Sequence, residues 1–205
     1  EWLSVMRSAH EIGFRTTATM MYGHVEKTKH LARHFLRLRE LQAQSAGTDG
    51  DGGFTEFVPL PFVHMEAPIY LKGKARKGPT FREAVLVHAV ARLVLHPHFT
   101  NIQTSWVKMG PEGVKSCLNA GVNDLGGTLM NESITRAAGT VHGQEMTPER
   151  MEKIICNAEG TSSTRRIPVQ RTTLYNIPAK RILEKPTESY NISPETKWIS
   201  SNKLT

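Results

Sequence analysis

Four groups of mostly polar residues, with the potential for chemistry, follow or lie within four short segments that we predict to be β-strands. In a parallel barrel, the active site lies at the carboxyl ends of the strands, so these groups predict a site for a polar ligand at that end. In chain order they are Tyr22, Gly23, His24 and Glu26; Pro59, Pro61 and His64; Asn101, Gln103, Ser105 and Trp106; and Asn123, Asp124, Gly126, Gly127, Thr128, Asn131 and Glu132.

Two of these groups are unusual for parallel strands, whose interiors normally carry Val, Ile and Leu. Asn101, Gln103 and Ser105 alternate along one predicted strand and therefore share one face. Burying three polar side chains would be costly unless they bind something; the alternative is that they face helices or water. Gly126 and Gly127 lack a side chain and would let a ligand approach the backbone, although a plain turn would look the same.

Other kinds of catalytic and metal site are poorly supported. His30 and His34 have a spacing that suits a metal, but Leu31 stands where a zincin has its glutamate, so we predict no metal site. Cys117 and Cys156 are too far apart in sequence to form an iron–sulfur motif. We expect both side chains to be buried in the protein, and we expect the protein to reside in a reducing compartment. No nucleophile elbow, P-loop or dinucleotide fingerprint is present, and catalytic residues remain unassigned.

The apolar pattern alternates helices and strands, which predicts an α/β fold. Four strand–helix units are typical of half a (β/α)8 barrel, and a doubly wound sheet is the alternative. We expect residues 1–175 to form the half-barrel with its C-terminal elements, and 176–205 to be a polar tail. The predicted strands are 16–22, 54–60, 101–107 and 122–125, with a possible extended segment at 166–175; the predicted helices are 1–12, 26–44, 81–95, 111–120 and 147–158; and the main loops are 63–80 and 126–132.

Length and charge narrow the functional classes. The chain has 205 residues and a net charge of +7, and it begins at Glu1 inside a predicted helix, so we expect a fragment of a longer protein. Its basic residues are scattered and lack an aromatic stacking strip, so we do not expect nucleic acid as a partner. The sequence contains no run of about 18 apolar residues, so it predicts no transmembrane helix. We expect a cytoplasmic protein, although a missing N-terminus leaves an organellar location open.

Several segments resemble one family, the radical SAM (S-adenosylmethionine) enzymes of deazaflavin synthesis that join tyrosine to a ribitylaminouracil. The resemblance covers most of residues 1–175, and the long NDLGGTLMNESI stretch is its most specific part. The matching segments are TTATMMYGHVE (16–26), LRELQ (38–42), GGFTEFVPLPF (52–62), HAVARL (88–93), NIQTSWVKMG (101–110), AGVNDLGGTLMNESITRAAGTVHGQEM (120–146) and QRTTLY (170–175).

The resemblance implies the second half of a TIM-type radical SAM barrel, with SAM and a 4Fe-4S cluster as cofactors. The family's CxxxCxxC cluster motif is absent from this chain and is expected in a missing N-terminal half-barrel, so the fragment alone should be inactive. Tyrosine and 5-amino-6-(D-ribitylamino)uracil would be the substrates, and a fused or separate lyase would complete FO, the deazaflavin chromophore. The alternatives are a futalosine-type enzyme of menaquinone synthesis and an inert module that binds an acidic partner.

The same resemblance implies roles for the polar groups. The cofactor-binding set, which would hold SAM or tyrosine, is Tyr22, His24, Glu26, Val58 and Pro59, with Val58 and Pro59 beside the adenine. The set that would hold the ribitylaminouracil is Asn101, Gln103, Ser105, Asn123, Asp124, Gly126, Gly127, Thr128, Asn131 and Glu132. Amide side chains suit such a ligand because each offers a donor and an acceptor.

Overall fold

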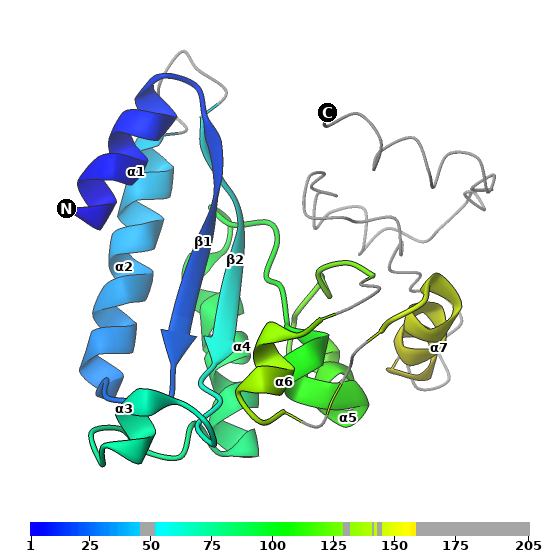
Figure 1. Ribbon diagram of the computed structural model, residues 1–205. Helices are drawn as coiled ribbons and strands as arrows, with labels where there is room; N and C mark the ends of the chain where they lie inside the picture. Colours follow the sequence, from blue (N-terminus) through cyan, green and yellow to red (C-terminus); the bar gives the residue numbers. More distant parts are fainter. Residues whose placement is uncertain (46–51, 129–131, 141, 143–144, 159–205) are drawn as a thin grey trace, which may run out of the picture.

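The structure is a computed structural model that describes residues 1–45, 52–128, 132–140, 142 and 145–158. Figure 1 shows helices packed around a pair of long neighbouring strands. The predicted extended segment at 166–175 and the predicted polar tail at 176–205 lie outside the described residues, as does Asn131. The elements are α1 (Trp2–Glu11), β1 (Arg15–Tyr22), α2 (Thr28–Ser45), β2 (Gly53–Pro61), α3 (Pro68–Leu71), α4 (Phe81–Leu95), α5 (Trp106–Asn119), α6 (Ile134–Ala137) and α7 (Pro148–Ala158).

The strands β1 and β2 are parallel neighbours, which confirms the predicted α/β class and the first two predicted strands. Their register pairs Thr17 with Glu56 and Tyr22 with Pro61, after an irregularity between Thr16 and Thr17. Parallel strands need a crossover between them, and α2 supplies it here.

Two further segments extend this arrangement in the same direction but are much shorter than predicted. Ile102 forms a parallel bridge with Phe57, and Gln103 forms a parallel bridge with Asp124. The predicted strand 101–107 is therefore wrong beyond Thr104, because Ser105 is already the N-cap of α5. Among the described residues the sheet proper has two strands, and a half-barrel is not shown.

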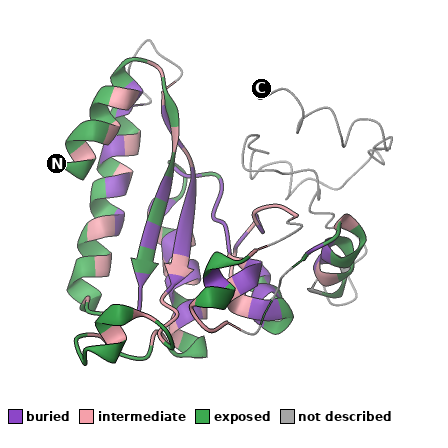
Figure 2. Ribbon diagram, viewed as in Figure 1, coloured by how far each residue is buried: buried purple, intermediate pink, exposed green. Residues whose placement is uncertain are grey.

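The two faces of β1 differ sharply, as the alternating colours in Figure 2 show. Ala18, Met20 and Tyr22 are buried in the core, whereas the side chains that alternate with them are exposed. This alternation is the period of two expected for a strand with one covered face. The core side of the sheet is filled from the helices by Phe35, Leu38, Leu41, Ala84, Ala91, Leu95, Val114 and Leu118.

Helix boundaries follow local signals in the sequence. Thr80 caps α4 as predicted: its hydroxyl accepts a hydrogen bond from the Glu83 amide at 3.2 Å. The Glu83 carboxylate accepts from the Thr80 amide at 2.7 Å, which completes a capping box. After α1, Gly13 adopts a φ of 87°, a left-handed conformation that glycine tolerates.

The helices and loops differ from expectation in three places. The segment 63–80, expected to be all loop, contains the one-turn helix α3, which starts at Pro68 because proline suits the first helical position. The helix expected at 111–120 is confirmed as the part of α5 that follows a kink at the non-helical Gly110, but the helical turn that begins at Trp106 was not expected. The short helix α6 was not expected. No helix among the described residues is long and apolar enough to cross a membrane.

A fully buried histidine in α4 predicts an acid-sensitive contribution to stability. The His88 Nδ1 atom lies 2.7 Å from the Ala84 carbonyl oxygen, and burial lowers the pKa of the ring. A base with a lowered folded pKa stabilises the fold above its unfolded pKa of about 6.5, and this contribution is lost as pH falls through the folded value. Replacing His88 by Leu removes this titration.

We therefore expect wild type to lose unfolding free energy relative to His88→Leu as pH falls from 7 to 5. The change should not exceed about 1.4 kcal/mol per pH unit. Denaturant unfolding of both proteins at several pH values measures it, and other titrating groups cancel in the difference. A difference that stays constant over this range would contradict the assignment.

Candidate functional site at the strand ends

A polar network joins the four parallel segments on the sheet face opposite the helices. Glu56, in the middle of β2, accepts a hydrogen bond from the Thr17 hydroxyl at 3.2 Å and from the Gln103 amide at 2.9 Å. Glu56 is also hydrogen bonded to the Asp124 carboxyl group. We call these four residues the Glu56 network; each comes from a different segment of the sheet arrangement.

The electrostatics of this network are set by burial. Glu56 is only 2% exposed and Asp124 only 5% exposed. Burial and the neighbouring charge of Asp124 raise the pKa of Glu56 to about 7, against the opposing effect of the bonds from Thr17 and Gln103. Two carboxylates this close cannot easily both be charged in a dry site, so near neutral pH they tend to share a proton.

The glycine-containing loop that follows Asp124 is held at two points. The Gly126 amide donates to the Asp124 Oδ1 atom at 2.7 Å, and the Trp106 indole donates to the Gly127 carbonyl oxygen at 3.0 Å. Gly126 has a φ of 82°, and a Cβ atom there would lie 3.2 Å from the Gln103 Oε1 atom. Glycine is therefore required both by the backbone conformation and by the close approach of Gln103.

Asn123, which the sequence analysis placed with Asp124 in the substrate-binding set, does not join this network. Its Oδ1 atom accepts from the Arg92 guanidinium at 2.6 Å and from the Ile102 amide at 2.9 Å. Its Nδ2 atom donates to the Thr100 carbonyl oxygen at 2.9 Å. The amide therefore needs no ligand to satisfy it, and it ties α4 to the strand segments instead.

Tyr22 is the last residue of β1, as predicted, but its side chain points into the core. Its side chain is 1% exposed and belongs to the core, because period-two alternation puts it on the covered face with Ala18 and Met20. Its buried hydroxyl has no hydrogen-bond partner in the part of the chain that the structure describes. Burial raises the pKa of Tyr22 far above its usual range, so the phenol stays neutral.

His24 and Glu26 do lie at the end of β1, where Glu26 organises the turn. Its carboxylate accepts from the Gly23 amide at 2.6 Å and from the His24 amide at 3.0 Å, and Arg76 lies 3.6 Å away. Burial pushes the pKa of Glu26 upward, but these hydrogen bonds and His24 outweigh it and lower the pKa. Glu26 is therefore an anion that holds the turn, and half-buried His24 is the more available of the two.

The other predicted residues occupy varied places. Val58 shares the face of Glu56, whereas Pro59 pairs with Met20 on the covered side. Asn101 is buried, and its backbone carbonyl oxygen accepts a hydrogen bond from the Phe57 amide of β2. Ser105 is the N-cap residue of α5, but its side chain makes no capping hydrogen bond. Thr128 is half-buried after the glycine pair. Glu132 accepts from the Thr135 amide at 2.9 Å, and its charge acts on Lys108.

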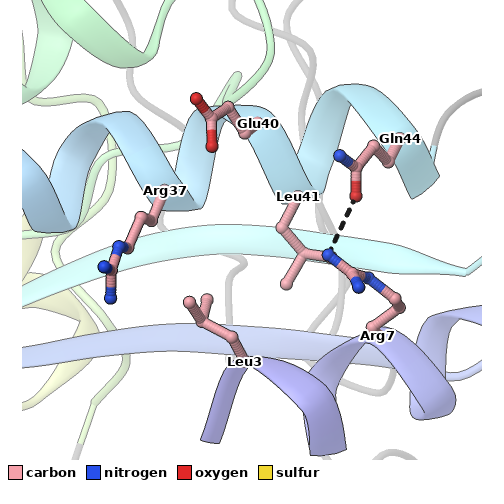
Figure 3. A pocket seen from close by; sticks show the side chains of 6 residues that line it. All are labelled: Leu3, Arg7, Arg37, Glu40, Leu41 and Gln44. Carbon is pink, nitrogen blue, oxygen red and sulfur yellow. Dashed lines mark hydrogen bonds between the residues drawn. The ribbon is translucent and has the colours of Figure 1, made fainter.

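The one hollow that we single out lies elsewhere, between α1 and α2 (Figure 3). It has a volume of about 160 Å³ and is lined by Leu3, Arg7, Arg37, Glu40, Leu41 and Gln44. The Arg7 guanidinium donates to the Gln44 side-chain oxygen across it at 3.3 Å. It lies on the outer helical layer, away from the strand ends, and most of its polar side chains are exposed, so we assign it no ligand.

The described residues do not offer a metal or cluster site. No group of three or more His, Cys, Asp or Glu side chains in this part of the chain could hold a metal ion. Cys117 is fully buried in the core, and burial raises the pKa of its thiol to about 11, so it is a poor thiolate ligand. The described residues therefore do not provide ligands for an iron–sulfur cluster.

Sequence reasoning missed two residues that organise the site, Glu56 and Arg92, and one contact made by a third, Trp106. Glu56 was overlooked although a lone carboxylate inside the apolar run FTEFVPLPF is a signal of a buried polar role. Trp106 was placed at a strand end but its bond to the loop was not foreseen. Arg92 could not have been found, because its partners are backbone carbonyls and Asn123, brought together only by folding.

Comparison with known proteins gives consistent results. The family model described as "CofH/MqnC C-terminal region" matches residues 51–179. The chain is 51% identical over 175 residues to the 5-amino-6-(D-ribitylamino)uracil–L-tyrosine 4-hydroxyphenyl transferase of Methanopyrus kandleri, covering 85% of this chain and 44% of that protein.

Two FO synthases are similarly related. The FO synthase of Mycobacterium leprae is 50% identical over 174 residues, which cover 85% of this chain and 19% of that enzyme. The FO synthase of Streptomyces avermitilis is 49% identical over 181 residues, which cover 88% of this chain and 20% of that enzyme. The chain thus spans about a fifth of the FO synthases and less than half of the transferase.

The close approach of Gly126 to Gln103 predicts a large effect of a single methyl group. Gly126→Ala adds strain from the positive φ and also crowds Gln103, whereas Gly73→Ala is a matched control because Gly73 has a φ of 68° with nothing within 4 Å. We expect Gly126→Ala to lose roughly 1–3 kcal/mol more unfolding free energy than Gly73→Ala. Denaturant unfolding tests this, and equal losses would show that the contact with Gln103 has no energetic weight.

Proposed function

Because the chain belongs to the CofH/MqnC C-terminal region family, we propose that it is the C-terminal half of a radical SAM transferase. The complete enzyme would join the 4-hydroxybenzyl group of tyrosine to 5-amino-6-(D-ribitylamino)uracil in synthesis of the deazaflavin chromophore FO. The single observation that carries this proposal is the similarity to the Methanopyrus transferase, whose name states the substrates. A partner or fused lyase, as the similarity to FO synthases suggests, would complete FO.

We propose that the four parallel segments are the second half of a (β/α)8 barrel. The exposed face of β1, with Thr17, Thr19 and Met21, would then look into the barrel. The edge of β1 that has no strand partner among the described residues would pair with a strand of an N-terminal half-barrel, because an unpaired strand edge leaves backbone donors and acceptors unsatisfied. The direction of the bridges at Ile102 and Gln103 supports this arrangement.

The cofactors fit this chain only in part. Bound SAM, reduced by a 4Fe-4S cluster whose ligands lie outside the described residues, would supply the radical chemistry that cleaves tyrosine. His24 and Val58 fit a position beside SAM, since both lie on or near the uncovered side of the sheet. Buried Tyr22 does not fit, and Glu26 would act by holding the turn that carries His24.

The substrate uracil would lie at the ends of the third and fourth segments. Asp124 and Gln103 offer a carboxyl and an amide next to Gly126, and the backbone of the glycine pair offers further polar groups. A uracil edge alternates N–H donors and carbonyl acceptors, which such side chains and backbone groups can pair. We propose that Asp124, Gln103 and the glycine loop bind the uracil, and that Asn123 stabilises the fold.

Two other functions remain as outcomes of the test. A futalosine-type enzyme of menaquinone synthesis would use other substrates at the same strand ends, and the family description includes that branch. An inert module that binds an acidic partner would show no turnover even with a cluster-bearing half. A cytoplasmic location remains our expectation for a biosynthetic enzyme with a buried free thiol at Cys117.

The functional test compares neighbouring residues in the enzyme that contains this chain and a cluster-binding half. Asp124→Ala should weaken use of the ribitylaminouracil by about ten- to a hundred-fold, since it removes a buried hydrogen-bonding carboxyl group. Asn123→Ala is the matched control: it should lower unfolding stability by about 1–3 kcal/mol through Arg92 and change the KM for the uracil little.

Anaerobic turnover with tyrosine, SAM and the uracil measures the coupled product, and calorimetry measures SAM binding. Wild-type turnover of futalosine-type substrates in place of the uracil would overturn the proposed function. An Asp124→Ala enzyme that keeps its KM for the uracil, or that loses SAM binding instead, would show that the substrate site is placed wrongly.

A further inference from the structure

Glu56 has no role in the proposed function, yet its position is costly to maintain. It is the only ionisable residue in β2, and its side chain is only 2% exposed. Two buried aromatic residues, Phe54 and Phe57, flank it in the sequence. A carboxyl group buried in this way must be hydrogen bonded, and here every partner belongs to a different segment of the sheet. The Glu56 carboxyl group therefore links its own strand to three other segments.

We propose that Glu56 is a positioning residue whose bond to Asp124 fixes the loop of residues 124–127 in the shape that receives the substrate. The inference rests on the proposed function for the identity of that substrate. The loop contacts on which the inference rests all lie within this chain. Glu56 is therefore assigned to hold the site together and not to touch the reacting atoms.

The path from Glu56 to the loop is short and continuous. Glu56 bonds to Asp124, and Asp124 accepts the Gly126 amide at 2.7 Å. Glu56 also accepts from Gln103 at 2.9 Å, and the Gln103 Oε1 atom lies 3.2 Å from where a Cβ atom on Gly126 would stand. Both arms reach the same glycine, so loss of the Glu56 carboxyl would release Gly126 from two sides.

The charge state of Glu56 decides whether this arrangement holds. Asp124 is the titratable group that faces it from the fourth segment, while Thr17 and Gln103 face it from β1 and the third segment as neutral partners. A protonated Glu56 donates to an Asp124 carboxylate. Above neutral pH both groups would be anions, and their repulsion would loosen the loop.

Three variants of the complete enzyme separate this role from a general structural one. Glu56→Gln keeps an acceptor for Gln103 and a donor for Asp124 but cannot ionise, whereas Glu56→Ala removes both. Thr55→Val is the matched control, because the neighbouring Thr55 hydroxyl donates to the Thr16 carbonyl oxygen at 3.2 Å and is not a member of the Glu56 network. Hydrogen exchange of the Gly126 amide and kcat/KM for the ribitylaminouracil are measured at pH 6 and pH 8.5.

Glu56→Ala should lose about tenfold in protection of Gly126 at pH 6, and Glu56→Gln should restore it. At pH 6, the protection of Gly126 and the kcat/KM of wild type should equal those of Glu56→Gln. At pH 8.5, both quantities should be about tenfold lower in wild type than in Glu56→Gln. Comparison at equal pH cancels the intrinsic change in exchange rate. Thr55→Val should follow wild type throughout.

A wild-type to Glu56→Gln ratio that does not change with pH would overturn the positioning role, even if Glu56→Ala fails to fold. So would equal protection of Gly126 in Glu56→Ala and wild type. The exchange readout needs no turnover, so it decides this role even when no coupled product forms. Absence of product from wild type, with a normal exchange pattern, would count against the proposed function alone.

Discussion

A carboxyl group inside a parallel β-strand imposes the main constraint on this structure. Glu56 cannot be solvated, so its partners must come from β1, from the segment at 101–104 and from the segment at 122–125. These segments must therefore lie in register around it, as the parallel bridges at Ile102 and Gln103 show. The third and fourth segments make only single bridges within the described part of the chain, so side-chain bonds supply much of the cross-strand connection that a longer ladder would otherwise give.

The two faces of the sheet arrangement carry different sets of polar contacts. On the helix side, Arg92 binds the carbonyl oxygens of Gly121 and Thr100 and the Asn123 side chain, so α4 is fastened to both short segments. On the opposite side, the Glu56 network leads to the glycine loop. Adjacent residues Asn123 and Asp124 point to different faces because strand side chains alternate, and they therefore have different hydrogen-bond partners.

The sequence predicted the elements better than the orientation of their side chains. Helices and strands with clear periodicity or caps, such as β1 and α4, were confirmed, and the polar residues Gln103 and Asp124 do come together. The side-chain directions of Tyr22 and Asn123 were not predicted, because a pattern of period two shows which residues share a face but not which face is covered. Glu56 was missed because its partners are 39 and 47 residues away, at Thr17 and Gln103.

Coupling between Glu56 and Asp124 is the central claim of this account, and a double-mutant cycle tests it most directly. The unfolding free energies of wild type, Glu56→Gln, Asp124→Asn and the double variant would be measured at pH 7 by denaturant titration. Residues that share a hydrogen bond in a network should show an interaction energy of about 0.5–3 kcal/mol. Additive effects, within about 0.3 kcal/mol, would contradict the claim that these two carboxyl groups hold the site together.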